Sequence, residues 1–432
     1  MTVKQKQKAQ NYVQSFFYPD VKELVEDFQL PVQKFVYQMV YGIIKSKSVI
    51  GQQIGVALEE KITLKKTCDR LYRNLKRPNL HEELMLTLMC KYAAEITDET
   101  PIIMDASDIY KPCANKMEGI AKVWDGSQHK PNPGFLTFQA SFCDPADPKK
   151  MKLYYSELFS LEEECTSENE KILDFIHQSA ILTSNRGIYI GDRGFDNGNF
   201  LTDMIENDNS FIFRGDDRNL LYNEKMLSYR EIAEQLDLSY EIISKNRTFR
   251  ANIVEVGYKL PNPPERKHKR KKIAKLYLVV AQEKGKGFVY YLCRFRKEYS
   301  YAKMLEMAIQ YYGLRWGIEE IHQQIKAKFG WEKIQFLKYT SLKNMNALLW
   351  VAASFIYNEV SKITIYLIKN LSNKMIYRNL AKELNKNLVY RLINIVSDLF
   401  HEFLIRPRKK YKGKYKKYYL EKQQYILVLN DS

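Results

Sequence analysis

The sequence lacks the patterns of a disulfide scaffold, a zinc site or a membrane protein. Its 6 cysteines include no CxxC pair, and none stands at zinc-ligand spacing from any of the 6 histidines. The longest nearly uninterrupted apolar stretch, 347–357, is far shorter than the roughly 18 residues of a membrane span. Residues 1–10 lack the apolar block of a secretion signal, so we expect a cytoplasmic protein with reduced, mostly structural thiols.

Glycine and proline are also scarce. With 18 Gly and 13 Pro against 45% hydrophobic residues, the chain is neither collagen-like nor of low complexity, and it has ample apolar surface to bury. At 432 residues it exceeds the size of one hydrophobic core, so we expect two to four folded domains.

Positive charge is in excess. There are 68 Lys and Arg against 51 Asp and Glu, which gives a net charge of +17. Two dense basic clusters, 266–272 and 406–417, add to this excess, and neither is an amphipathic helix with an apolar face. A polyanion is therefore the expected partner, and nucleic acid is favoured over an anionic membrane.

The first part of the chain, from Tyr12 to about Glu95, has apolar residues at helical spacing. Residues 48–58 are expected to turn one helix into another, with a basic helical segment at 64–75. A helix-turn-helix-like DNA-binding unit and an ordinary helical bundle with a basic face are equally compatible with this pattern.

After Pro101 the pattern changes to short β-like runs, followed by alternating helix and strand. This order predicts a mixed sheet flanked by helices, and a second β-rich block from 215 to about 294 resembles an insertion. Strands are expected at 102–104, 119–124, 135–142, 152–159, 187–191, 211–213, 249–260, 273–281 and 287–295, with a helix at 167–181.

Two aspartates directly follow apolar runs: Asp105 follows 102–104 and Asp192 follows 187–191. The carboxyl ends of strands are where ligands gather in open α/β sheets. Taken alone, each aspartate is better explained as part of a simple strand-ending turn.

A helix is predicted from about Tyr312. At about 100° per residue its apolar residues form one stripe, and Tyr312, Arg315, Glu319 and Lys326 lie within about 60° of one another beside that stripe. A carboxylate can hold a divalent cation, and the cations and phenol can hold phosphate oxygens. Ordinary intrahelical pairs such as Arg315 with Glu319 are the alternative interpretation. The stripe consists of Leu314, Ile318, Ile321, Ile325 and Phe329.

The spacing of these four residues resembles the Tyr-Arg-Glu-Lys signature of the insertion-sequence-four type of DDE transposase. Residues 105–108 resemble the first-aspartate motif of that family, and residues 191–195 resemble its second. The interval of 127 residues from Asp192 to Glu319 matches the position of the family's β-rich insertion.

The resemblance implies a ribonuclease H-like core in which Asp105, Asp192 and Glu319 bind two Mg²⁺ or Mn²⁺ ions for phosphodiester cleavage and strand transfer. Tyr312, Arg315 and Lys326 would hold DNA phosphates, and His322 is expected to lie at the surface or contact a phosphate. Rival carboxylates are Asp108, Asp196 and Glu320. Further expected DNA contacts are Arg214, Arg266, Lys267, Lys269, Arg270, Lys271 and Lys272.

The sequence therefore predicts an α/β transposase whose partners are transposon ends and target DNA, acting as a homodimer at the bacterial nucleoid. Two alternatives stay open: a catalytically silent DNA-binding derivative, and a nuclease of the same fold that does not transpose. The expected domains are a helical DNA-binding domain (1–98), the first part of the core (99–214), the β-rich insertion (215–296), the second part of the core (297–340) and a helical C-terminal region with a basic tail (341–432).

One departure concerns tryptophan. Some relatives stabilise a DNA hairpin with a flipped base stacked on a tryptophan of the insertion. None of the 4 tryptophans lies between Gly215 and Arg294, so Tyr258 or Phe249 would have to substitute.

Overall fold

The computed structural model describes residues 3–370 except 113, 115, 126–129, 148–149, 164, 166, 217, 245–246 and 262–271, together with 393–394 and 396–397. For residues 3–10, 125 and 359–370 it describes the backbone alone. The basic tail 406–417 lies outside the described residues, as do Arg266, Lys267, Lys269, Arg270 and Lys271.

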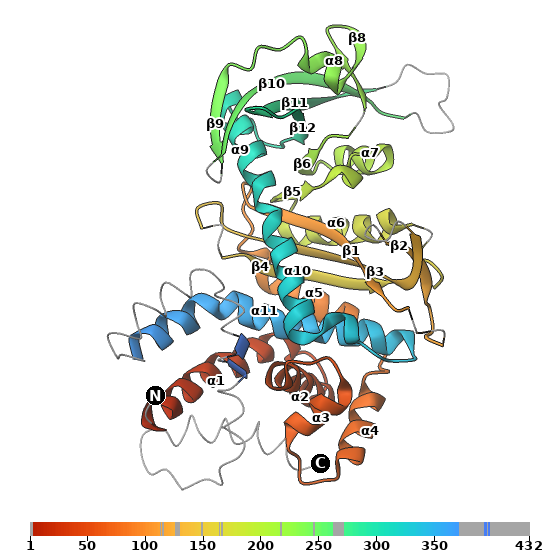
Figure 1. Cartoon of the computed structure of the whole chain (residues 1–432), viewed down its shortest axis with the longest axis vertical. Coiled ribbons are helices and arrows are strands. Elements are labelled where there is room, and N and C mark those ends of the chain that lie inside the picture. Colours follow the sequence, from red (N-terminus) through yellow and green to blue (C-terminus); the bar gives the residue numbers. More distant parts are fainter. Residues whose placement is uncertain are drawn as a thin grey trace.

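Five helices form the first part of the chain; the first four lie at one end of the molecule, and the fifth packs against the sheet strand 152–159 (Figure 1). The predicted turn at 48–58 is only partly correct, because residues 51–58 themselves form a helix; residues 47–50 connect it to the preceding helix, and a turn at 59–63 connects it to the next. The two helices on either side of this turn approach closely, since a Cβ on Gly55 would lie 2.9 Å from Cys68 Sγ. The five helices are α1 (Val3–Val25), α2 (Leu30–Ser46), α3 (Gly51–Leu58), α4 (Leu64–Asn74) and α5 (Leu80–Ala93).

A mixed sheet follows, as the sequence predicts. Its central strand β1 pairs antiparallel with β3 and parallel with β5, β3 pairs antiparallel with β4, and β5 pairs parallel with β6. This arrangement is consistent with a ribonuclease H-like core. The elements are β1 (Pro101–Tyr110), β2 (Ala121–Asp125), β3 (Lys130–Phe142), β4 (Lys152–Phe159), α6 (Glu168–Thr183), β5 (Ile188–Gly191), η1 (Arg193–Phe195), α7 (Gly198–Glu206) and β6 (Ser210–Arg214).

The β-rich block continues this sheet. Strand β12 pairs antiparallel with β6, so core and block share one hydrogen-bonded sheet whose order is β2-β3-β1-β5-β6-β12-β11-β10-β7-β8. Figure 1 shows the block at the end of the molecule opposite the first helices. Its elements are β7 (Asn219–Tyr222), β8 (Lys225–Ser228), α8 (Tyr229–Ala233), β9 (Tyr240–Ser244), β10 (Arg247–Lys259), β11 (Ile273–Glu283) and β12 (Phe288–Arg294).

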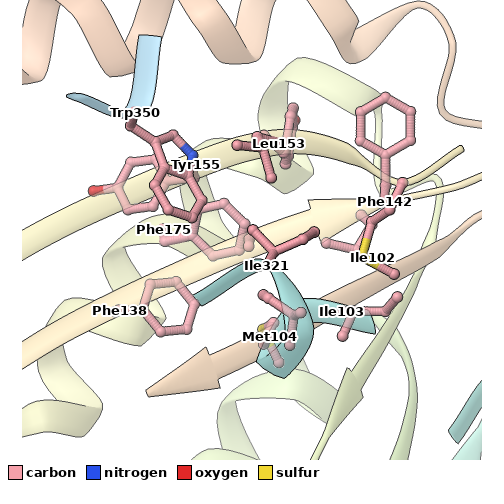
Figure 2. Packing of buried hydrophobic residues seen from close by; sticks show 14 of the residues in the cluster. Ile102, Ile103, Met104, Phe138, Phe142, Leu153, Tyr155, Phe175, Ile321 and Trp350 are labelled. Atoms are coloured by element: carbon pink, nitrogen blue, oxygen red, sulfur yellow. The ribbon is translucent and has the colours of Figure 1, made fainter. Parts of the chain in front are cut away.

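The chain then returns to the core along two nearly continuous helices, α9 (Tyr301–Leu314) and α10 (Trp316–Phe329). A short 3-10 helix, η3 (Trp331–Lys333), leads into α11 (Tyr339–Asn370). The predicted apolar stripe is confirmed: its last four residues are buried and Leu314 is partly buried. Figure 2 shows Ile321 of α10 among Ile103, Met104 and Phe175, so α10 packs directly on the sheet beside β1.

Helix α11 connects the first helices to the sheet, because it contacts α1, α2 and α5 as well as β4. Its residues 347–356 are buried, in agreement with the apolar run in the sequence. Within the described residues, no helix has the length and apolar character needed to span a membrane.

Candidate active site

Two of the predicted acids lie at the same level of neighbouring parallel strands. Ile103 of β1 is paired with Ile190 of β5, and Asp105 and Asp192 each follow two residues later. Asp192 caps η1, and its Oδ1 accepts a hydrogen bond from the Gly194 amide at 2.9 Å. The expectation that Asp105 directly follows a strand is wrong, because β1 continues to Tyr110 and Asp105 lies within it, whereas Asp192 does follow the end of β5. The parallel pairing of β1 with β5 places the two acids at matching levels of the core sheet.

Arg315 contacts both the third predicted acid, Glu319, and Asp105. Arg315 lies at the junction of α9 and α10, with Nη2 2.6 Å from Glu319 Oε1 and Nη1 3.4 Å from Asp105 Oδ1. The intrahelical pair with Glu319 is thus present, and the same guanidinium also contacts an acid 210 residues away in sequence. Burial lowers the pKa of Arg315, but Tyr312, Glu319 and Asp105 outweigh burial and raise it.

Tyr312 lies between two guanidinium groups. The Arg315 guanidinium is 5.9 Å and the Arg214 guanidinium 5.8 Å from the centre of its ring. Arg214 ends β6, so the structure brings this predicted DNA contact to the side of α9. The Tyr291 ring packs against Tyr312 at 5.1 Å. Arg214 and Arg315 therefore both lie near the Tyr312 ring, and Arg315 also pairs with Glu319; two cations and a phenol hydroxyl are a suitable set for anionic oxygens.

Lys326 does not join this cluster. Its Nζ lies 3.1 Å from Glu332 Oε1, in η3. The turn that carries Glu332 is held by Lys111, whose buried ammonium donates to the carbonyl oxygens of Glu332 and Ile334, and burial lowers the pKa of Lys111 to about 8. Lys272 is exposed at the start of β11, away from the acids.

The expectation for His322 is wrong. Its side chain is only 7% exposed, and its Nδ1 lies 3.3 Å from Asp105 Oδ2. The ring packs against Trp331 and Trp350, with centroids 5.6 and 6.3 Å away. A signal existed in the sequence: at about 100° per residue, His322 falls between the polar edge and the apolar stripe of α10.

Glu168 is an acid that the sequence argument missed. It begins α6, and burial together with the charges of Asp192, Asp105 and Asp108 raises its pKa. Its position at a helix N-terminus is ordinary for an acidic residue and gave no functional signal. Burial is the largest cause of this shift, and the three aspartates add to it.

The rival carboxylates have other surroundings. Asp196 has a fully buried side chain that accepts hydrogen bonds from Arg218 Nε at 2.7 Å and Tyr229 Oη at 2.7 Å, so it ties the η1 loop to the β-rich block. Glu320 is exposed. Asp108 stands an odd number of residues after Asp105 on β1, so the strand alternation places the two on opposite faces, although the charge of Asp108 still contributes to raising the pKa of Glu168.

Neither proposed substitute for the missing tryptophan is an exposed platform. Tyr258 is 7% exposed, its hydroxyl donates to the Gly198 carbonyl, and the Arg218 guanidinium covers its ring at 5.5 Å. Phe249 is partly buried against the core.

The donor set of this site suits a hard divalent cation, because carboxylate oxygens are the ligands that Mg²⁺ and Mn²⁺ prefer. Among the described residues, no group of three or more His, Cys, Asp or Glu side chains is arranged to hold a metal ion. The guanidinium of Arg315 lies between Asp105 and Glu319 and acts there as a stand-in cation. The position between these two carboxylates therefore accommodates positive charge, so the residues fit such an ion.

Residues 159–356 match the family described as transposase DDE domain. The match begins at the end of β4, so it includes Asp192 and Glu319 and leaves Asp105 outside it. No curated protein matches the chain. The family match, together with the mixed sheet, supports a DDE transposase.

Proposed function

We propose that the protein is a cut-and-paste transposase of the insertion-sequence-four type, which cleaves DNA at transposon ends and joins those ends to target DNA. The observation that carries this proposal is the shared cation at the sheet edge: Arg315 bridges Asp105 and Glu319, and Asp192 ends the adjacent parallel strand. The family match independently supports transposase chemistry.

Asp105, Asp192 and Glu319 would hold two Mg²⁺ or Mn²⁺ ions. When bound, such ions activate the attacking hydroxyl and stabilise the leaving oxygen in an in-line displacement at phosphorus. The chain's own cations would position the DNA. Arg315 and Arg214, on either side of Tyr312, would bind phosphate oxygens next to the cleaved bond, and Lys326 would bind a phosphate farther along α10.

The domain division of the sequence analysis is kept as part of this proposal. The segment 1–98 would bind DNA, 99–214 and 297–340 would form the catalytic core, 215–296 would be the insertion, and 341–432 would be the C-terminal region. The protein would act at the bacterial nucleoid as a homodimer that holds two transposon ends.

Helix α4 is the best candidate for DNA contact in the first domain. Its Lys65, Lys66 and Arg73 are exposed and lie within about 100° around the helix, opposite the buried Thr67, Cys68 and Leu71. Two of these cations stand in the first turn, where the helix dipole disfavours positive charge. The exposed Asp69 lies on the same face, so the face carries three cations and one anion, and its net positive charge suits a polyanion.

The α4 triple variant replaces Lys65, Lys66 and Arg73 with Ala. Its ion-pair control variant replaces three lysines that each pair with an acid elsewhere: Lys150, Lys303 and Lys338.

The proposed function is tested with a plasmid that carries the DNA flanking the coding gene, including its inverted repeats. Purified wild-type protein is expected to nick and join these ends only with Mg²⁺ or Mn²⁺. Asp105→Asn, Asp192→Asn and Glu319→Gln should each lower the rate by at least about 10²-fold, because each removes a charge that the reaction needs at the developing transition state.

Glu320→Gln is the matched control. It removes the same charge from the adjacent, exposed position and should leave the rate within about twofold. Cleavage that survives in all three acid variants would overturn the assignment. DNA binding without any cleavage would favour the catalytically silent alternative, and cleavage without joining would favour the nuclease.

A further inference from the structure

The two oxygens of Asp105 have different neighbours. Oδ1 faces the Arg315 guanidinium, which also holds Glu319, whereas Oδ2 lies 3.3 Å from Nδ1 of His322. Oδ1 is therefore the oxygen directed at the cation position, and Oδ2 is directed away from it. A carboxylate that presents one defined oxygen needs its other oxygen to be held.

We propose that His322 is a positioning residue: it donates its Nδ1 proton to Asp105 Oδ2 and so turns Oδ1 toward the cation position of the active site. This inference rests on the proposed function for the identity of the site. An imidazole that donates one nitrogen to a ligand carboxylate fixes that ligand's orientation, as outer-shell partners do at metal sites.

The surroundings of His322 are suited to this role. Trp331 and Trp350 are both fully buried, lie next to each other and pack against the ring, and Trp331 is itself fixed by a 2.9 Å hydrogen bond to Asn346 Oδ1. These contacts restrict the movement of the imidazole, which is only 7% exposed.

The second ring nitrogen, Nε2, gives a further argument for placing the proton on Nδ1. His322 Nε2 is buried and has no hydrogen-bond partner within the described part of the chain. A nitrogen that carries a proton there would leave a buried donor unsatisfied, which is costly. The proton is therefore better placed on Nδ1, which lies at an ion-pair distance of 3.3 Å from Asp105 Oδ2.

Two substitutions separate positioning from packing. His322→Phe keeps an aromatic ring against the two tryptophans and removes the donor, whereas His322→Asn keeps a side-chain N–H near the place of Nδ1 and removes most of the ring. Mn²⁺ binding to the full-length, DNA-free protein is measured by electron paramagnetic resonance of free Mn²⁺, and thermal unfolding is followed on the same samples.

We expect His322→Phe to weaken Mn²⁺ binding about 10-fold or more with little change in the melting temperature. His322→Asn should bind Mn²⁺ within about threefold of wild type although it melts at a lower temperature. In DNA cleavage, His322→Phe should raise the Mn²⁺ concentration for half-maximal rate by the same factor as the dissociation constant. Wild-type Mn²⁺ affinity in His322→Phe would overturn the inference, whatever the behaviour of His322→Asn.

Asp192→Asn and Glu319→Gln keep the two hypotheses distinguishable. If both weaken Mn²⁺ binding and His322→Phe does not, the site stands and only the role of His322 is wrong. If none of the three changes Mn²⁺ binding, the metal site of the proposed function is itself wrong.

Discussion

Asp192 and Asp196 stand four residues apart, yet the structure predicts opposite effects when each is neutralised. The Asp196 carboxylate is fully buried and holds the charged Arg218, the Tyr229 hydroxyl and the Asp216 amide. Removing one partner of a buried ion pair destabilises a protein by about 3–5 kcal/mol, because the other charge stays buried without compensation. In a domain of about 150–250 residues, a loss of about 3 kcal/mol in the free energy of unfolding lowers the melting temperature by roughly 6–12 °C.

Asp192→Asn should behave differently. An amide oxygen can still accept the hydrogen bond from Gly194, so we expect a stability change within about 0.5 kcal/mol. Thermal unfolding and Mn²⁺ binding, measured side by side, separate the two residues: Asp196→Asn should lose stability and keep Mn²⁺ affinity in the folded protein, and Asp192→Asn should do the reverse. Equal stabilities, or loss of Mn²⁺ binding in Asp196→Asn alone, would refute this reasoning.

Three further predictions concern charge. Burial and three nearby aspartates raise the pKa of Glu168 in the folded protein. Ionisation of Glu168 therefore opposes folding only above its unfolded-state pKa of about 4.3. Glu168→Gln should raise the urea midpoint of metal-free protein at pH 7.5 and leave it nearly unchanged at pH 4. Arg315→Gln removes the guanidinium that lies between Asp105 and Glu319. After solvent screening, the guanidinium is expected to disfavour Mn²⁺ binding by about 1–2 kcal/mol, so the variant should bind Mn²⁺ roughly 5–30-fold more tightly in DNA-free protein, measured by paramagnetic resonance. An unchanged affinity would show that the guanidinium does not compete with the metal ion. The α4 triple variant should flatten the slope of log binding constant against log salt by up to about 3 in a fluorescence anisotropy titration with duplex DNA, whereas equal slopes in this variant and the ion-pair control variant would exclude α4 from the interface.

Local patterns predicted much of the fold. The strands around Asp105 and Asp192 and the apolar stripe of α10 follow from residue periodicity, which depends on neighbours in the sequence. The contact between Arg315 and Asp105 joins residues 210 positions apart and depends on strand order and on how α10 packs, so periodicity alone cannot give it. The same limit applies to His322, because its burial is created by Trp331 and Trp350.

Asp196 shows a second limit. In sequence it differs little from Asp192, since both are aspartates of one short segment after a strand. What separates them is a set of partners from the β-rich block, including Arg218 and Tyr229, whose side chains become neighbours only when that block folds against the η1 loop. The sequence also carried no signal for the pairing of β6 with β12, which makes core and block one continuous sheet. Strand patterns in an insertion show that strands are present but not which strand of the core they pair with.

The β-rich block therefore contacts both halves of the candidate site. Through Asp196 it holds the loop that carries Asp192. Through strands β9, β10 and β11 it contacts α9, where a Cβ on Gly313 would lie 3.3 Å from Ser244 Oγ. Helix α9 runs through Arg315, which contacts Asp105, directly into α10, which carries Glu319 and His322. Any displacement of the block relative to the core thus shifts Asp192 and the α10 group together, which makes the insertion a structural part of the site rather than a separate attachment.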